Sequence, residues 1–372
     1  MSLMWVDSFS QYGSDEALLL NGLYAENSTE NNTGEGNQLV IDPDPLASGY
    51  VMRMGKRHSI LYFTNVLRRV FPTNLTTVGV GTRIWLENLP TSSKCAVIPF
   101  SFRDNANNNL VNIEVDPTGR LIVWRGTLGI GEITRTTMLG ATSVPVITSN
   151  AWQHVEAKVT FDETTGSVVV QVQGQEVLNL TNINTSPGDV QVASWACVNY
   201  ENGVTPTVAP PYTYYKDLVA WNTTGSYNND FMGTVNIQPL NPDADVTLGS
   251  WVPSTGTTGW DILNNVPPID SEFISAAIGG TSQAEFDMQP VANDVSSIRA
   301  AVVLVRARKS DAGDGNIKVG IKRSGSESLS GDIPLTTAMT YYLRVFETDP
   351  VTGVPITPAQ MNDMKVVIDR TL

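Results

Sequence analysis

The sequence predicts an all-β protein made of two packed β-sheets followed by a second, smaller β-sandwich module. Strand patterns dominate from Met4 to about Asn222 and return after Ser271, and neither stretch contains a convincing long helix. With 30 glycines, 21 prolines and only 16% charged residues among 372, the chain has the turn-rich composition that suits β architecture. We therefore expect strands packed face to face in the first unit.

Two long hairpins define this first unit. In "NLVNIEVDPTGRLIVW", Val111, Ile113 and Val115 alternate with residues of the opposite face before a turn at 116–119. A second hairpin, "WQHVEAKVTFDETTGSVVVQV", turns at 162–166. Such alternation predicts sheets with one face in a core. Further strands are predicted at "ALLLNG", "GYVMRMG", "SILYF", "TVGVGTRIWLEN", "CAVIPFSFRD", "VQVASWACV" and "YYKDLVAW".

A change in composition divides the chain near "AWNTTGSYNNDFMGTVNI". The segment that follows is broken by Pro and Gly too often for regular sheet. We predict a first domain over residues 1–225, a connecting segment over 226–270 and a C-terminal β module over 271–372. Within that module Thr357 precedes Pro358 as an N-cap, which predicts one short helix before the last strand.

The composition limits the function classes. A net charge of −14 argues against an electrostatic grip on nucleic acid or on an anionic membrane. No apolar run reaches the about 20 residues of a membrane span, and the start shows no secretory signal, so we expect a soluble chain. Cys95 and Cys197 lie in apolar segments and are expected to be buried free thiols.

The order of the strands resembles a known fold. "SNAWQHVEAKVTFDETTGSVVVQVQGQEVLNLTNINT", with the closing strand "YYKDLVAWNTTG", resembles the concanavalin A-like or laminin-G-like jelly roll over roughly the first 225 residues. The run from Lys216 to Ala276 is similar to a segment of tailed-bacteriophage virion proteins that join such a jelly roll to a C-terminal β module, and "DPVTGVPITPAQMNDMKV" also fits.

The resemblance implies a non-enzymatic virion structural protein, such as a tail fibre, a spike or a capsid decoration subunit. Its partners would be other copies of itself in a homo-oligomer such as a trimer, other head or tail proteins, and a host-surface glycan bound with avidity. The alternative is a glycan-degrading depolymerase of the jelly-roll glucanase type. Glu114 and Asp116 come nearest to its carboxylate pair, although the turn at Asp116 favours a solvated hairpin end.

Other catalytic motifs are absent from the sequence, and we expect no catalytic or cofactor-binding residue. His58 and His154 lie in strand patterns without a Gly-x-Ser-x-Gly elbow. The Gly-x-Gly in "GTLGIGEITR" precedes no helix and is expected to be a turn.

One metal site, for calcium, remains an open hypothesis. Asn241, Asp243 and Asp245 alternate as at the start of an EF-hand loop, but Val246 stands where the glycine is required. A looser calcium site at Asp243 and Asp245, or in "IDPDPL" at Asp42 and Asp44, is the one cofactor hypothesis.

Two surface features are candidates for contact with partners. Tyr212, Tyr214 and Tyr227 could stack on sugar rings, although tyrosines at a sheet end more commonly cap a core. A late basic cluster is predicted to dock on an acidic neighbour in an assembly, with a solvated sheet face as the alternative. Its members are Arg306, Arg308, Lys318 and Lys322.

Overall fold

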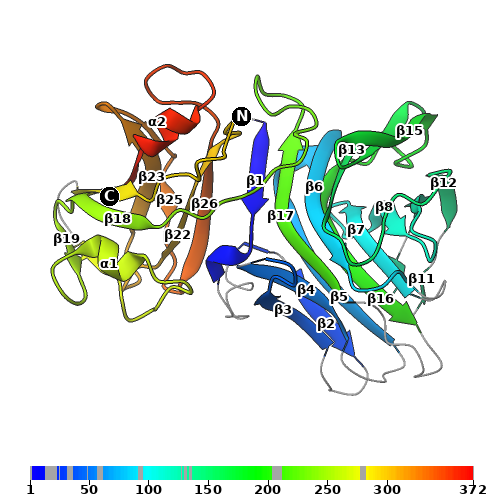
Figure 1. Cartoon of the computed structure of the whole chain (residues 1–372), viewed down its shortest axis with the longest axis horizontal. Helices are drawn as coiled ribbons and strands as arrows, with labels where there is room; N and C mark the ends of the chain where they lie inside the picture. Colours follow the sequence, from blue (N-terminus) through cyan, green and yellow to red (C-terminus); the bar gives the residue numbers. More distant parts are fainter. Residues whose placement is uncertain are drawn as a thin grey trace.

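The computed structural model describes most of the chain as antiparallel β-sheet (Figure 1). The described residues are 2–12, 23–24, 26–31, 37–47, 49–56, 62–90, 95–126, 128–129, 132–133, 136–202, 212–276 and 282–371. None of their helices is long and apolar enough to cross a membrane. The predicted all-β class with a jelly-roll sandwich is confirmed. The strands form an N-terminal sandwich and a C-terminal set of smaller sheets.

The first sheet of the sandwich, sheet A, has the strand order β15-β14-β13-β6-β17-β4-β3, and β1 also pairs with β17. The predicted hairpin around 162–166 is its β13–β14 pair. Its strands are β1 (Leu3–Asp7), β3 (Asn37–Pro43), β4 (Tyr50–Lys56), β6 (Thr77–Leu86), β13 (Gln153–Thr160), β14 (Gly166–Val172), β15 (Gln175–Ile183) and β17 (Thr213–Asn222).

The second sheet, sheet B, has the order β12-β9-β8-β7-β16-β5-β2. The predicted hairpin around 116–119 is its β8–β9 pair. Its strands are β2 (Glu26–Asn31), β5 (Tyr62–Leu75), β7 (Cys95–Arg103), β8 (Asn109–Val115), β9 (Leu121–Arg125), β12 (Thr137–Ala141) and β16 (Val192–Asn202); β10 (Leu128–Gly129) and β11 (Glu132–Ile133) form a separate small pair.

The core lies between the inward sides of the two sheets. Val111, Ile113 and Val115 of sheet B are fully buried, as are Val155 and Ala157 of sheet A, so the predicted alternation is confirmed. Cys95 and Cys197 are buried and form no disulfide within the described residues, as predicted. Burial of this continuous apolar layer is what holds the sheets together, because each apolar side chain removed from water stabilises the fold by about 1.5–3 kcal/mol.

The C-terminal module contains a six-stranded sheet and two short pairs, β22–β26 and β19–β20. The strands are β18 (Pro242–Thr247), β19 (Trp251–Pro253), β20 (Ile274–Ala276), β21 (Ser282–Met288), β22 (Ala301–Ala307), β23 (Asn316–Arg323), β24 (Ser326–Leu329), β25 (Ile333–Pro334), β26 (Thr340–Phe346) and β27 (Lys365–Thr371). Helix α2 (Pro358–Asn362) begins with the predicted Thr357 cap. Strands β18 and β19 and helix α1 (Gly259–Leu263) fall within the predicted connecting segment, but they pack with this module.

The N-terminal strand joins the two parts of the molecule. Figure 1 shows β1 between β17 of the sandwich and β26 of the C-terminal module. Glu347 accepts hydrogen bonds from the backbone N–H groups of Ser2 and Leu3, at 2.9 and 3.0 Å. Beside them Trp221, Met232 and other apolar side chains form a separate buried cluster. Residues 223–241, which contain no helix or strand, cross this junction.

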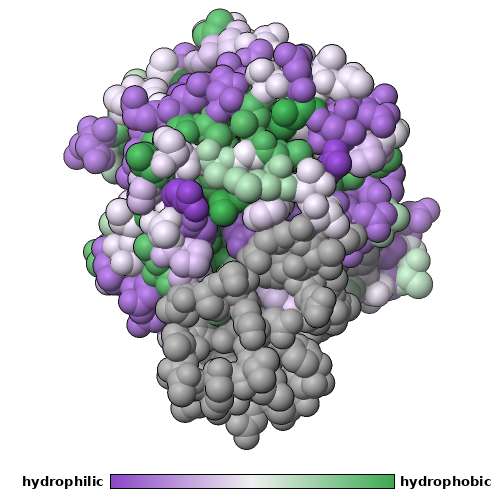
Figure 2. Space-filling view, turned by 90° about the vertical axis from the view of Figure 1, so that its right-hand side faces the viewer, coloured by the Kyte–Doolittle hydropathy of each residue, from purple (hydrophilic) through white to green (hydrophobic). Residues whose placement is uncertain are grey.

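The opposite end of the sandwich is closed by contact between β12 and β15. Figure 2 views this end and shows apolar surface gathered above the centre and bordered by hydrophilic surface. Met138 on β12 and Val144 beyond it are more than half exposed here. Each sheet thus has an outward side that extends from the end closed by β12 and β15 to the end joined to the C-terminal module.

Candidate functional site

The outward side of sheet B carries a row of polar side chains across five strands. Strand residues alternate between sides, so the neighbours of the core residues point away from the sandwich. Strand pairing places Arg68 beside Ala196, Ala196 beside Ser101, Ser101 beside Asn112, and Asn112 beside Trp124. The row therefore crosses β5, β16, β7, β8 and β9, with two small residues at its centre.

Glu114 lies next to this row, one step along β8 from Asn112 and on the same side. Both side chains are 4% exposed. The Asn112 amide donates to the Gly126 carbonyl at 3.2 Å, while its Oδ1 has no hydrogen-bond partner in the part of the chain that the structure describes. An apolar patch adjoins them, formed by Val66, Ala96, Ile98, Ala196, Val198 and Tyr200. We call these polar and apolar residues together the sheet B site.

The structure separates the two carboxylates that the sequence brings together. Asp116 accepts hydrogen bonds from the backbone N–H groups of Thr118 and Arg120, and its other oxygen bonds the Arg120 guanidinium at 2.8–2.9 Å. Burial opposes ionisation of Asp116, but the hydrogen bonds from Thr118 and Arg120 outweigh it and lower its pKa. Asp116 therefore fixes the hairpin turn. Glu114 is the only Asp or Glu in the three neighbouring strands β7, β8 and β9.

Sequence reasoning missed Arg68, Asn112 and Trp124 as parts of one site. The available signal was that β8 reads polar at both Asn112 and Glu114, between apolar residues that fill the core. Two consecutive outward positions of an otherwise apolar strand, both polar and both buried, need partners. Their neighbours on β5 and β9 are set by long-range pairing, which no local pattern reveals.

The outward side of sheet A carries a second buried polar cluster, beneath the segment at 230–237. Glu156 accepts hydrogen bonds from the backbone N–H groups of Met232 and Gly233, at 2.9 and 3.0 Å. Asp217 accepts one from Ile237 at 2.9 Å. These carboxylates clamp the connecting segment onto the sandwich, and we call them, with Arg83 and His154, the sheet A clamp.

Burial sets the protonation of the sheet A clamp. It raises the pKa of Glu156 to about 7, against the two backbone N–H groups that favour the carboxylate. It also raises the pKa of Asp217 to about 6, and burial together with nearby Arg83 lowers the pKa of His154 to about 4. His154, predicted on a polar strand face, is in fact 1% exposed, with Nδ1 at 3.9 Å from Glu156. His58 lies outside the described residues.

Three of the four carboxylates predicted to bind calcium are engaged with protein groups. Asp245 accepts hydrogen bonds from Gly259 and Trp260 at the start of α1, both at 2.7 Å, while Asp243 is exposed. Asp42 pairs with an arginine and Asp44 with a lysine. No group of three or more His, Cys, Asp or Glu side chains suited to a metal occurs in the described ranges.

The predicted basic assembly patch is largely neutralised within the chain. Arg306 pairs with Asp270, Lys322 with Glu285, and Lys318 lies 3.8 Å from Asp332. Arg308 remains exposed. The acidic partners lie too far along the chain to be recognised in the sequence, and docking of these residues on an acidic neighbour stays a prediction.

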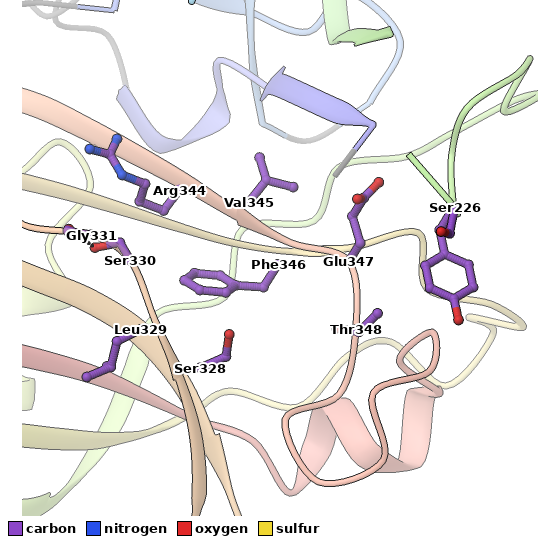
Figure 3. A pocket seen from close by; sticks show the side chains of 11 residues that line it. Ser226, Ser328, Leu329, Ser330, Gly331, Arg344, Val345, Phe346, Glu347 and Thr348 are labelled. Carbon is purple, nitrogen blue, oxygen red and sulfur yellow. Dashed lines mark hydrogen bonds between the residues drawn. The ribbon is translucent and has the colours of Figure 1, made fainter. Parts of the chain in front are cut away.

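The three predicted tyrosines fall in two places. Tyr212 and Tyr214 lie together on the outward side of sheet A, with ring centroids 6.5 Å apart. Tyr227 instead lines a cavity of about 610 Å³ between the segment after β17 and the C-terminal module, with Ser328, Arg344 and Glu347 (Figure 3). The sequence could not show that Tyr227 lies apart from Tyr212 and Tyr214, because its position depends on where the segment after β17 crosses the molecule.

Comparisons with known proteins identify no family for the chain. No protein-family model matches the chain, and neither does any curated protein. An endo-β-1,4-glucuronan lyase of the fungus Trichoderma reesei is 13% identical, covers 59% of this chain and 95% of its own, and has a TM-score of 0.35. The alginate lyase vAL-1 from Chlorella virus is 10% identical, covers 54% of this chain and 91% of its own, and has a TM-score of 0.36. The family 7 alginate lyase A1-II′ is 16% identical, covers 50% of this chain and 82% of its own, and has a TM-score of 0.37.

These comparisons correct one prediction. The chain was expected to be non-enzymatic, and this expectation is not upheld, since the similar structures are polysaccharide lyases and a sialidase. They also give no support to the virion, tail-fibre or attachment predictions. At this level of identity the likeness concerns the β-sandwich fold, and no reaction or catalytic residue is carried over from it.

Proposed function

We propose that the jelly roll degrades a polysaccharide and that the sheet B site is its catalytic surface. The observation that carries this proposal is the position of Glu114, a buried carboxylate beside Asn112 in a row that also holds Arg68 and Trp124. A ring for stacking, a cation for charge pairing and a carboxylate for proton transfer are the groups that a sugar site requires.

The residues favour elimination over hydrolysis. Hydrolysis uses two carboxylates about 5–9.5 Å apart, and Asp116 is engaged in its own turn. Elimination from a uronic acid needs one base and a cationic or amide partner for the carboxylate of the sugar. Glu114 would take the proton from the carbon next to that carboxylate and pass it to the glycosidic oxygen, which would leave as a hydroxyl while a carbon–carbon double bond forms. Asn112 would bind the carboxylate of this sugar, and Arg68, three strands along the row, would bind the carboxylate of another sugar of the chain.

The test is an assay of the full chain on alginate and on glucuronan, the polymers after which the similar lyases are named. Ultraviolet absorbance reports unsaturated products, and a reducing-end assay reports all cleavage. The parent protein should give both signals, Glu114→Gln should lose them, and Asp116→Asn should keep them. Reducing ends without unsaturated products would contradict elimination, and absence of both signals on acidic and neutral polymers would contradict degradation.

Attachment to a phage particle is a separate proposal that rests on the resemblance of residues 216–276 alone. In this proposal the C-terminal module holds the subunit on a head or tail, among copies of itself and other virion proteins. The test is immunogold labelling of particles with an antibody against this chain. Label on the particle would support the proposal, and unlabelled particles would contradict it.

A further inference from the structure

A row of aromatic and charged side chains lies on the outward side of sheet A, at the end that the C-terminal module leaves uncovered. Strand pairing places Val40 beside Arg53, Arg53 beside Tyr214, and Tyr214 beside Trp85. Trp152 directly precedes β13, one residue beyond the pair formed by Gln153 and Ile84, and so continues the row. The residues between these positions, such as Met52, Met54 and Tyr215, belong to the core, so the row points outward.

The rings in this row pack edge to face. Trp85 and Tyr214 have centroids 5.0 Å apart at 79°, and Tyr212 lies 6.5 Å from Tyr214 at 67°. The Arg53 guanidinium lies 4.5 Å from the centre of the Tyr212 ring. Both tyrosines are half-buried. Trp85 is 7% exposed, and its indole N–H is buried without an acceptor in the described part of the chain.

The charges around the rings cancel. Arg53 pairs with Asp42 at 3.0 Å, and Lys216 pairs with Asp44 at 2.6 Å. Asp44 also accepts from the Trp152 indole at 3.1 Å, and the Lys216 ammonium lies 4.3 Å from the centre of that ring. Two cations and two carboxylates are thus held in place by the aromatic side chains, and they leave the row without net charge but rich in hydrogen-bonding groups.

We propose that this row binds a neutral polysaccharide chain, at a site separate from the proposed catalytic surface. Aromatic rings offer apolar faces to the sugar rings, and the fixed charged groups are suited to bonding hydroxyls. Neighbouring strands are about 4.8 Å apart, so the row presents one side chain per sugar-sized step along a polymer lying across the strands. Because the site is on the other sheet from Glu114, the inference goes beyond the proposed function.

The test is affinity electrophoresis of the full chain in gels with hydroxyethylcellulose, with alginate or with no polymer. Glu114→Gln serves as the background, so that cleavage cannot alter the gel. We expect hydroxyethylcellulose to retard this protein, Tyr212→Ala and Tyr214→Ala each to weaken binding at least tenfold, and Tyr214→Phe to bind as the parent because the ring remains. Tyr227→Ala, which removes a distant tyrosine, is the matched control.

Three results would overturn the inference: no retardation in hydroxyethylcellulose, equal retardation of the alanine variants and the parent, or tyrosine-dependent retardation in alginate alone. Unfolding midpoints verify that each variant is folded. Tyr212 precedes β17 and lies outside the strands, so its truncation keeps the test valid if Tyr214→Ala is unstable. Failure here would leave the proposed degradation standing, since that is measured by product release with Tyr212 and Tyr214 intact.

Discussion

Glu114 and Glu156 are both buried carboxylates on outward sides of the sandwich, one on each sheet, but they have different surroundings. Glu156 is enclosed by the segment at 230–237 and holds two of its backbone N–H groups. Glu114 lies beside Asn112, whose amide oxygen has no hydrogen-bond partner among the described groups. Both residues adjoin the row of outward side chains on sheet B. Burial alone therefore does not identify a reactive carboxylate.

The pKa of Glu156 points the same way. A raised pKa is typical of a general acid or base, and Glu156 has one, at about 7. Yet its two oxygens are committed to Met232 and Gly233, and Arg299 also donates to the Met232 carbonyl at 2.7 Å. The perturbation thus reflects a structural clamp, and the catalytic proposal rests on position in the sheet and not on protonation.

The largest expected effect is on activity. Glu114→Gln should reduce the rate of polymer cleavage by about 10²–10⁴-fold, because it removes a base and keeps the shape of the side chain. Glu156→Gln should keep the rate within a few fold when assayed well below the unfolding temperature. Equal losses in the two variants would erase the distinction between the two carboxylates.

The next effect is on stability, where the Glu156 variant should lose more than the Glu114 variant. Glu156→Ala leaves the buried N–H of Met232 and the half-buried N–H of Gly233 without their acceptor, and the loss for a buried group costs about 1–3 kcal/mol. Urea unfolding should therefore show a fall of several kcal/mol in the free energy of unfolding. Glu114→Ala should fall by less, and a larger fall there would mean that Glu114 is a structural group.

A third effect is the pH dependence of stability. Glu156 keeps its proton in the folded state up to a pKa of about 7, above its ordinary 4.5. Its contribution to stability is therefore fully present below about pH 4.5 and is lost as the pH rises through 7. Asp217 acts in the same direction between 3.8 and about 6, whereas His154, with a pKa of about 4, adds stability as the pH rises from 4 to 6.5.

Comparison with Glu156→Gln isolates the first of these contributions, because His154 and Asp217 are common to both proteins. The free energy of unfolding of the parent should decline relative to that of the variant between about pH 4.5 and 7. Urea titrations at intervals across this range measure the difference. A difference that stays constant with pH would show that Glu156 titrates as in the unfolded chain.

The sequence predicted what depends on local pattern. Alternation at Val111, Ile113 and Val115 predicted which side of β8 fills the core, and Thr357 predicted the start of α2. Partners far along the chain were not predictable. The donors to Glu156 lie 76 and 77 residues away, and the acid that pairs with Arg306 lies 36 residues away, so their meeting depends on the crossing of the segment between the domains.

The smallest effect tests how much of the clamp is electrostatic. Lys158, on the same side of β13 as Glu156, pairs with Asp230 at 2.7 Å, and its ammonium lies 5.1 Å from the centre of the Phe231 ring. Because the Asp230 carboxylate is mostly exposed, Lys158→Met should lower the free energy of unfolding by less than about 1 kcal/mol, and added salt should reduce the difference. Urea unfolding at low and high salt measures it. A loss as large as that of Glu156→Ala would mean that the segment is held by its surface charges, whereas the expected small loss places the holding force in the buried N–H bonds to Glu156.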